Sequence, residues 1–165
     1  MASVIKETLY LLLKIGVIAF VFIIIFTVLF GLVRYEDTSM VPSIKDGDLV
    51  IYHQYKAEGY ETRDVIVLEY GGAKQIRRVV AMAGDVVDIT EEGLLINGAL
   101  QQEQDIYQVT ERYIEGIDFP LTVPEGNIFV LGDNRTDVTD SRIYGPVEIE
   151  DTFGKVMTII RRRGI

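Results

Sequence analysis

The hydrophobic positions of this chain follow two different patterns, one before Arg34 and one after it. From Ile15 to Val33 the sequence runs for nineteen residues without a charge, and no polar face interrupts it. About 20 apolar residues in a helix cross the hydrocarbon core of a bilayer, whereas a helix on the surface of a globular protein carries a polar stripe. The pattern therefore predicts a transmembrane anchor over residues 15–33.

The residues on either side of this run favour a retained anchor over a cleaved secretory signal. A secretory signal has a shorter apolar centre that is followed by a small-residue cleavage site, but here Arg34-Tyr35-Glu36-Asp37 follows. Lys6 and Lys14 precede the run, and cytoplasmic flanks of membrane spans are enriched in Lys and Arg. We therefore expect a single-pass protein of the cell membrane, with residues 1–14 in the cytoplasm and residues 35–165 outside it.

After Arg34 the apolar residues form short runs rich in Val, Ile and Tyr, which are typical of β-strands separated by turns. The predicted strands are Leu49–Tyr55, Val65–Tyr70, Gln75–Met82, Val86–Ile89, Ile128–Leu131 and Val156–Ile160. Asn97-Gly98 predicts a hairpin turn after residues 94–96. The polar stretch 101–115 is expected to be a mobile loop. The predicted fold class is mostly β: an N-terminal transmembrane helix followed by one antiparallel, barrel-like β domain over residues 35–165.

Charge and composition exclude several kinds of site. The net charge is −9, and residues 1–33 carry +1, so the remainder carries −10. Such an acidic domain argues against a nucleic-acid partner, which requires clustered Lys and Arg. The single basic cluster, residues 161–163, is read as a solubilising tail, with contact to anionic lipid as the alternative. The absence of cysteine excludes disulfides and thiolate sites, and His53 is the only histidine. No metal or organic cofactor is expected.

Three polar segments contain the candidate chemistry. Ser39, Met40 and Pro42 lie shortly after the predicted membrane span, where a serine would face the membrane surface. Taken alone, this segment also fits an ordinary linker. In the second segment, Arg77 and Arg78 occupy a predicted strand, so their side chains point to opposite faces. The third segment breaks a predicted strand into a turn dense in short polar residues that can hold a loop rigid: Gly132, Asp133, Asn134, Arg135, Asp140, Ser141 and Arg142.

In this order and spacing, the three segments resemble those of type I signal peptidases, which are membrane serine proteases that remove signal peptides from exported proteins. The matching patterns are Ser-Met-x-Pro, R-R-V-V-x-x-x-G-D and G-D-N-R followed by D-S-R-x-x-G. The resemblance covers nearly the whole chain and is to the Gram-positive, single-anchor branch; the chain is also similar to pilus-associated signal-peptidase-like proteins. It implies a β fold, a serine nucleophile with a lysine base, and substrates that bind as an added strand.

Carried over by position, the resemblance makes Ser39 the nucleophile and places its backbone N–H in the oxyanion hole. It also implies that Met40 and Pro42 contact the substrate. The family's lysine base, however, falls on Arg77, and an arginine does not lose its proton in proteins. The serine that supports the lysine falls on Val138, and the position two before the nucleophile is Asp37.

These three departures fit together. We hypothesise that Arg77 and Asp37 form an ion pair across the former catalytic dyad, with their charged groups within about 6 Å, while Val138 packs where the lysine had its polar support. Three other residues could in principle act as the base that removes the Ser39 proton. Lys74 lies on the opposite strand face, His53 fits an ordinary strand residue, and an Arg77 partner would weaken Asp37.

Two functions remain open from the sequence. The first is an active serine endopeptidase that removes signal peptides from exported proteins, with a base still to be identified. The second is a catalytically degenerate accessory that holds segments of secreted or pilin-like proteins during surface pilus assembly. In either case the expected partners are secreted preproteins or pilin-like substrates and the lipid bilayer.

Overall fold

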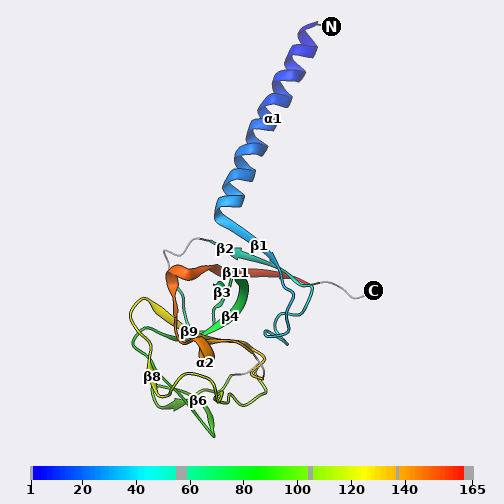
Figure 1. Cartoon of the computed structure of the whole chain (residues 1–165). Helices are drawn as coiled ribbons and strands as arrows, with labels where there is room; N and C mark the ends of the chain where they lie inside the picture. The colour runs from blue at the N-terminus through cyan, green and yellow to red at the C-terminus, as the bar shows by residue number, and fades with distance from the viewer. Residues whose placement is uncertain (1, 55–58, 104–105, 137, 162–165) are drawn as a thin grey trace.

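The computed structural model describes residues 2–54, 59–103, 106–136 and 138–161, and in it an N-terminal helix stands apart from a β-sheet body (Figure 1). Helix α1 (Ala2–Leu29) has 28 residues, which at 1.5 Å per residue gives a length of about 42 Å. Its segment Val4–Leu29 is long and apolar enough to cross a membrane, and none of it is buried against the body.

The end of this helix corrects the predicted anchor. The apolar run was expected to remain helical to Val33, but α1 ends at Leu29 and residues 30–33 belong to strand β1 (Phe30–Arg34). β1 pairs with strand β2 (Leu49–His53) from Phe30↔His53 to Arg34↔Leu49. Apolarity alone does not distinguish a helix from a strand, and this cross-strand pairing decides the outcome.

The body contains two sheets in which all strand pairs are antiparallel. The first has the order β1-β2-β11-β3-β4-β9-β10 and the second the order β7-β6-β5-β8. The remaining elements are β3 (Val65–Tyr70), β4 (Ala73–Met82), β5 (Val86–Thr90), β6 (Gly93–Ile96), β7 (Ala99–Leu100), β8 (Leu121–Thr122), β9 (Asn127–Leu131), α2 (Ser141–Tyr144), β10 (Val147–Glu148), the 3-10 helix η1 (Ile149–Asp151) and β11 (Thr152–Ile160).

The predicted mostly antiparallel β fold is confirmed, but the barrel-like closure is wrong. Closure requires the two end strands of a sheet to pair with a consistent stagger. In the described part of the chain the larger sheet ends at β1 and β10, and these two do not pair with each other. Register shifts between Val79 and Ala81 and within β11 bend the strands without closing the sheet.

The predicted strands match the observed ones closely at the centre of each segment. β3 has the predicted bounds, and the turn at Asn97-Gly98 joins β6 to β7 with positive φ at both residues. β11 begins at Thr152, four residues before the predicted Val156. The two-residue strands β7, β8 and β10 are too short to give a sequence pattern. Tyr55, the predicted end of the first strand, lies outside the described residues.

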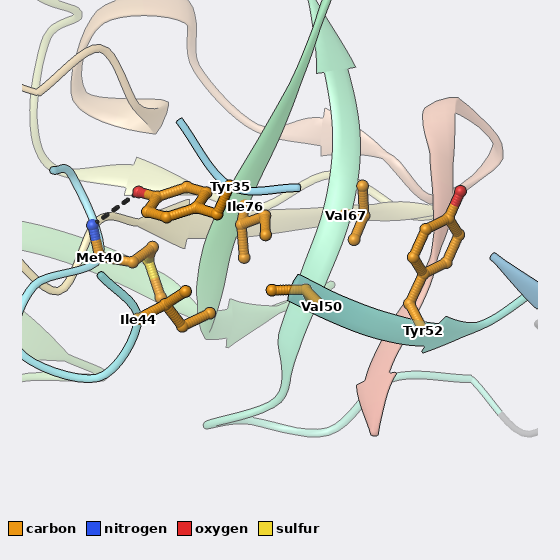
Figure 2. Packing of buried hydrophobic residues seen from close by; sticks show 7 residues of the cluster. All are labelled: Tyr35, Met40, Ile44, Val50, Tyr52, Val67 and Ile76. Carbon is orange, nitrogen blue, oxygen red and sulfur yellow. Dashed lines mark hydrogen bonds between the residues drawn. The ribbon is translucent and has the colours of Figure 1, made fainter. Parts of the chain in front are cut away.

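Figure 2 shows the hydrophobic cluster that joins the segment after β1 to strands β2, β3 and β4. Its buried members are Tyr35, Met40, Ile44, Val50, Tyr52, Val67 and Ile76. Tyr35 and Met40 flank the segment that contains Ser39, so this cluster fixes the position of that segment relative to β2, β3 and β4. Two further clusters fill the space between the sheets and under α2.

Gly31 and Tyr52 form a tight cross-strand contact at the junction. A Cβ at Gly31 would lie 2.0 Å from a ring carbon of Tyr52, and Tyr52 is only 3% exposed, so the ring has no open space to move into. The end of the helix is joined to the body as well, because the Gln54 backbone N–H donates to the Leu29 carbonyl at 2.8 Å.

We predict that Gly31→Ala destabilises the body, because the added methyl must displace the buried Tyr52 ring. Overpacking of this kind costs about 1–3 kcal/mol. Thermal unfolding of the detergent-solubilised chain, followed by circular dichroism, measures the change. The matched control is Gly16→Ala, because a Cβ at Gly16 meets no atom within 4 Å. Equal melting temperatures for the two variants would contradict this account of the junction.

Candidate active site

Ser39 lies in a turn that follows β1, and it is 3% exposed. Its hydroxyl oxygen lies 2.6 Å from Asp37 Oδ2, 2.7 Å from a terminal nitrogen of Arg77 and 2.8 Å from the Tyr35 hydroxyl. A hydroxyl has one proton and two lone pairs. An ionised Asp37 only accepts and Arg77 only donates, so Ser39 donates to Asp37 and accepts from Arg77. Tyr35 then donates to the remaining lone pair, and the hydrogen-bonding capacity of Ser39 is filled.

Arg77 lies on β4, and its side chain is 3% exposed. Its Nε and one terminal nitrogen donate to the Thr139 carbonyl at 3.2 and 2.8 Å. The other terminal nitrogen donates to the Ile76 carbonyl at 2.6 Å as well as to Ser39. These bonds fix a permanently charged guanidinium beside the candidate nucleophile.

The charged groups of Arg77 and Asp37 are 4.0 Å apart, which lies within the distance that the ion-pair hypothesis requires. The contact differs from the expected direct, bidentate pair, because the Ser39 hydroxyl bonds both groups. The physical reason is that the Thr139 carbonyl already occupies the side of the guanidinium that carries Nε.

The Asp37 carboxylate also accepts backbone hydrogen bonds. Its Oδ1 accepts from the N–H of Thr38 at 2.6 Å and from the N–H of Ser39 at 3.2 Å. The Ser39 N–H was expected to belong to an oxyanion hole, and here it is directed at a carboxylate. Partial burial by itself would raise the pKa of Asp37, but the hydrogen bonds from Ser39 and Thr38 and the nearby charge of Arg77 outweigh it and lower the pKa below its usual value.

Tyr35 is a member of the site that sequence reasoning missed. It is 4% exposed, and its hydroxyl accepts the Met40 N–H at 2.9 Å while contacting Ser39. Burial raises the pKa of Tyr35 above its usual value of 10.0, which keeps the phenol a donor. The available signal was a tyrosine four residues before the serine, but only a turn between them brings the two hydroxyls together.

Val138 is 5% exposed, and its backbone N–H donates to the Tyr113 hydroxyl at 2.9 Å. A Cβ added to Gly132 would lie 2.8 Å from a Val138 methyl and 2.7 Å from the Ser39 carbonyl. Val138 therefore packs against the backbone that supports Ser39. It also precedes Thr139, the residue whose carbonyl holds Arg77.

The polar segment after β9 supports Ser39 from behind. The Asn134 N–H donates to the Ser39 carbonyl at 2.9 Å. The Asp133 carboxylate, which is 2% exposed, accepts hydrogen bonds from Nε of Arg78 at 2.7 Å and from one of its terminal nitrogens at 2.6 Å. Arg77 and Arg78 thus point to different partners, as expected from a strand, but Arg78 is paired with a buried acid instead of being solvated.

The same segment contains two further buried arginines. Arg142 bonds the Asp140 carboxylate at 2.8 and 2.9 Å, and neither side chain is exposed. Asp140 also accepts the Gly132 N–H, and the Ser141 hydroxyl accepts the Val130 N–H. Arg135 pairs with Glu103 at 2.6 Å. The polar stretch 101–115 therefore packs against the site in the residues that the structure describes.

The structure also places four other residues that the sequence singled out. Met40 was expected to contact the substrate; its side chain is fully buried in the cluster of Figure 2, and the substrate contact remains a prediction. Pro42 is exposed, and its substrate contact remains a prediction. Lys74 contacts Tyr52 and Phe153. The His53 ring packs against Phe30 at 5.4 Å. Within the described ranges, no group of three or more acidic or histidine side chains could hold a metal ion.

The chain is similar in sequence and in structure to several known peptidases. The chain is 32% identical over 134 residues to signal peptidase I of Bacillus caldolyticus, covering 73% of this chain and 74% of that protein. It is also 32% identical over 134 residues to the thylakoidal processing peptidase 1 of Arabidopsis thaliana, but spans only 38% of that longer protein. The crystal structure of a signal peptidase I from Enterococcus faecalis superimposes with a TM-score of 0.50 at 30% identity, covering 61% of this chain and 97% of that one.

The model of the family described as signal peptidase, peptidase S26, matches residues 7–160. This match covers the apolar helix, the Ser39 segment, β4 and the polar segment after β9. The chain therefore belongs to the signal peptidase family, peptidase S26.

Proposed function

We propose that this protein is a membrane-anchored signal-peptidase homologue that holds extended segments of secreted or pilin-like proteins without cleaving them efficiently. The observation that supports this most directly is the position of the Asp37 carboxylate, which accepts both the Ser39 hydroxyl proton and the Ser39 backbone N–H. In the proposed arrangement the segment Val4–Leu29 of α1 contains the membrane span, the N-terminus lies in the cytoplasm and the body lies outside it.

Three features of the site oppose cleavage. The residue at the family's base position is an arginine that donates to Ser39 and cannot take its proton. Both lone pairs of the Ser39 hydroxyl are engaged by donors. The Asp37 carboxylate carries negative charge next to the N–H groups that would stabilise an oxyanion. The loss of one oxyanion donor alone lowers the catalytic rate by about 100- to 1,000-fold.

The features needed to hold an extended polypeptide remain. β4 pairs with β3 over residues 73–78, whereas its other neighbour, β9, pairs only from Arg78 onward. In the described structure, residues 73–77 of β4 therefore present a strand edge beside Ser39, and an extended segment can add to such an edge. The family's substrate class and the resemblance to pilus-associated relatives favour secreted polypeptides as the bound partner.

A second candidate function is peptidase activity with Asp37 as the base. The 2.6 Å contact between the Ser39 hydroxyl and Asp37 Oδ2 favours it, because a base must lie within hydrogen-bond reach of the proton that it removes. The lowered pKa of Asp37 disfavours it, because a weak base provides little driving force for proton transfer.

We predict that the wild-type chain in proteoliposomes cleaves a model preprotein no faster than Ser39→Ala, while both retain the preprotein in a crosslinking assay. Product formation is followed by mass spectrometry. Cleavage by the wild type that disappears in Ser39→Ala would contradict the proposed function and favour the second candidate.

The triple variant Asp37→Ser, Arg77→Lys, Val138→Ser is predicted to gain cleavage by about 100-fold or more over wild type. It supplies a base that can be deprotonated and removes the carboxylate from the oxyanion position. Arg78→Lys is the matched control, because it makes the same chemical change at the neighbouring residue, which bonds Asp133. A well-folded triple variant that remains inactive would show that more than these three residues prevents turnover.

The second candidate makes its own prediction about pH. Hydrogen bonds from Ser39 and Thr38 hold the pKa of Asp37 below the usual range of an aspartate, so Asp37 is ionised throughout the neutral range. Cleavage that depends on Asp37 would therefore stay level from about pH 8 to pH 5 and fall only near or below pH 4, as the carboxylate becomes protonated. A rate that instead rises steeply between about pH 6 and pH 8 would point to a different base.

A further inference from the structure

A hollow of about 620 Å³ lies beside the Ser39 site, and we call it the Thr139 hollow. It is lined by residues 112–115, residues 138–139 and Ile143 of α2. Thr139 belongs to both places, because it lines the hollow and its carbonyl accepts two hydrogen bonds from Arg77. Since Arg77 also donates to the Ser39 hydroxyl, only one side chain separates the Thr139 hollow from the candidate nucleophile.

The walls of the Thr139 hollow are fastened to one another by hydrogen bonds. The Tyr113 hydroxyl accepts the Val138 N–H at 2.9 Å, and the Tyr113 ring lies 4.4 Å from the guanidinium of the buried Arg142. The Arg142 side chain donates to the Glu111 carbonyl at 3.1 Å, and the Ile117 N–H donates to the Arg142 carbonyl at 2.9 Å. The hollow is therefore a preformed part of the frame that supports Ser39, as binding sites usually are.

Two large aliphatic side chains from separate segments are exposed at the Thr139 hollow. Ile114 is fully exposed, and Ile143 is 37% exposed. A single exposed apolar residue is ordinary on a protein surface. Here, however, both belong to one hollow that Tyr113 and Val138 also line. A concave site with mainly apolar walls and a few polar groups is the usual form of a binding pocket.

The charge at the Thr139 hollow that remains unbalanced is acidic. Arg112 lines the hollow, but its guanidinium is already paired with Asp88 at 2.7 Å. Glu115 lines the hollow too, and it forms no ion pair among the residues that the structure describes. An acidic group beside an apolar surface favours a basic residue next to the apolar side chain that binds there.

The free edge of β4 leads toward this hollow. An extended segment can add to β4 along residues 73–77, but β9 pairs with β4 from Arg78 onward. The added segment must therefore leave the sheet at Arg77. Thr139, which is exposed, contacts the Arg77 guanidinium at this point. The residues that follow in the added segment thus pass over Thr139 and reach the hollow.

We propose that the Thr139 hollow receives an apolar side chain of the held polypeptide, from the residues that continue beyond the part paired with β4. The proposal rests on the proposed function, because it requires a polypeptide that lies along β4. Ile114 and Ile143 contact the apolar side chain, and Glu115 favours a Lys or Arg beside it. The hollow thereby selects the held polypeptide by residues that do not touch Ser39.

The test uses the full-length chain in proteoliposomes with a model preprotein whose signal peptide is intact. Because the chain has no cysteine, a single introduced cysteine can carry a benzophenone crosslinker at a defined place. Ile114→Cys and Ile143→Cys report the Thr139 hollow, and Ala73→Cys reports the free edge of β4. Tyr107→Cys is the matched control, because Tyr107 is 86% exposed and lines a different hollow.

The labels at positions 73, 114 and 143 are expected to crosslink the preprotein at least about fivefold more than the label at 107. Mass spectrometry then locates the crosslinked preprotein residues. The residue reached from 114 is expected about five to ten positions from the one reached from 73, always on the same side of it, because an extended chain advances about 3.4 Å per residue.

Three other outcomes would overturn the proposal in distinguishable ways. Crosslinking at 73 with only the control level at 114 and 143 would exclude the Thr139 hollow and leave the proposed function intact. Crosslinking at none of the three positions would contradict the proposed function itself. Crosslinks at 114 between two copies of this chain, in place of crosslinks to the preprotein, would assign the hollow to a second copy.

Substitutions in the hollow test its contribution to binding. Ile114→Asn with Ile143→Asn is expected to reduce crosslinking of the preprotein at position 73 by at least about fivefold, because two apolar contacts are lost. Val109→Asn is the control, because Val109 is 57% exposed and lines a different hollow. Unchanged crosslinking in the double variant would overturn the proposal.

A charge exchange tests the acidic rim. A preprotein with Lys beside the mapped apolar residue is expected to crosslink at least about twofold better than one with Glu there, and Glu115→Lys is expected to reverse this order. Glu92→Lys, at a residue that lines a different hollow, is the control. The same order of the two preproteins in wild type and Glu115→Lys would contradict the role given to Glu115.

Discussion

The arrangement of the site depends on one buried cation, the guanidinium of Arg77. A charge removed from water must have its hydrogen-bond donors satisfied or the fold is strongly destabilised. The Thr139 and Ile76 carbonyls and the Ser39 hydroxyl meet that requirement, and the Asp37 carboxylate lies 4.0 Å away. The same bonds that make this arginine tolerable therefore engage the serine. A lysine in this position could lose its proton and release the hydroxyl, whereas an arginine holds it permanently.

The other arginines of the polar core have different partners from those of Arg77. Arg78, Arg135 and Arg142 each have a carboxylate oxygen between 2.6 and 2.8 Å away. These three pairs brace the segment after β9, and through Gly132 and Asn134 that segment supports the Ser39 backbone. Arg77 is instead matched mainly by neutral carbonyls and a hydroxyl. Under the proposed function, the polar framework around Ser39 therefore serves to hold the site in place, and Arg77 acts as one of its supports instead of as a base.

Much of this could be predicted from the sequence, for identifiable physical reasons. Strands such as β3 and β9 are built on the apolar runs Val65–Leu68 and Ile128–Leu131, so their positions follow from local pattern. The end of α1 could not be predicted in this way, because Phe30–Val33 is apolar in either conformation and the choice is made by pairing with β2. The pairing of β11 with β2 could not be predicted either, since it joins residues that are more than a hundred positions apart in the chain.

For the candidate site too, one part followed from the sequence and another only from the tertiary structure. The sequence determined its chemical composition, because an arginine at position 77 cannot lose its proton and so cannot act as the base that a lysine at that position would be. Only the tertiary structure decided how these groups bond. It directs the Ser39 hydroxyl and N–H at the Asp37 carboxylate, adds Tyr35 as a third partner, and places Met40 in the core. Whether a side chain can lose its proton follows from its residue type, so the sequence alone reveals it. Its hydrogen-bond partners depend on which groups the folded chain brings within about 3 Å of one another, and only the tertiary structure decides that.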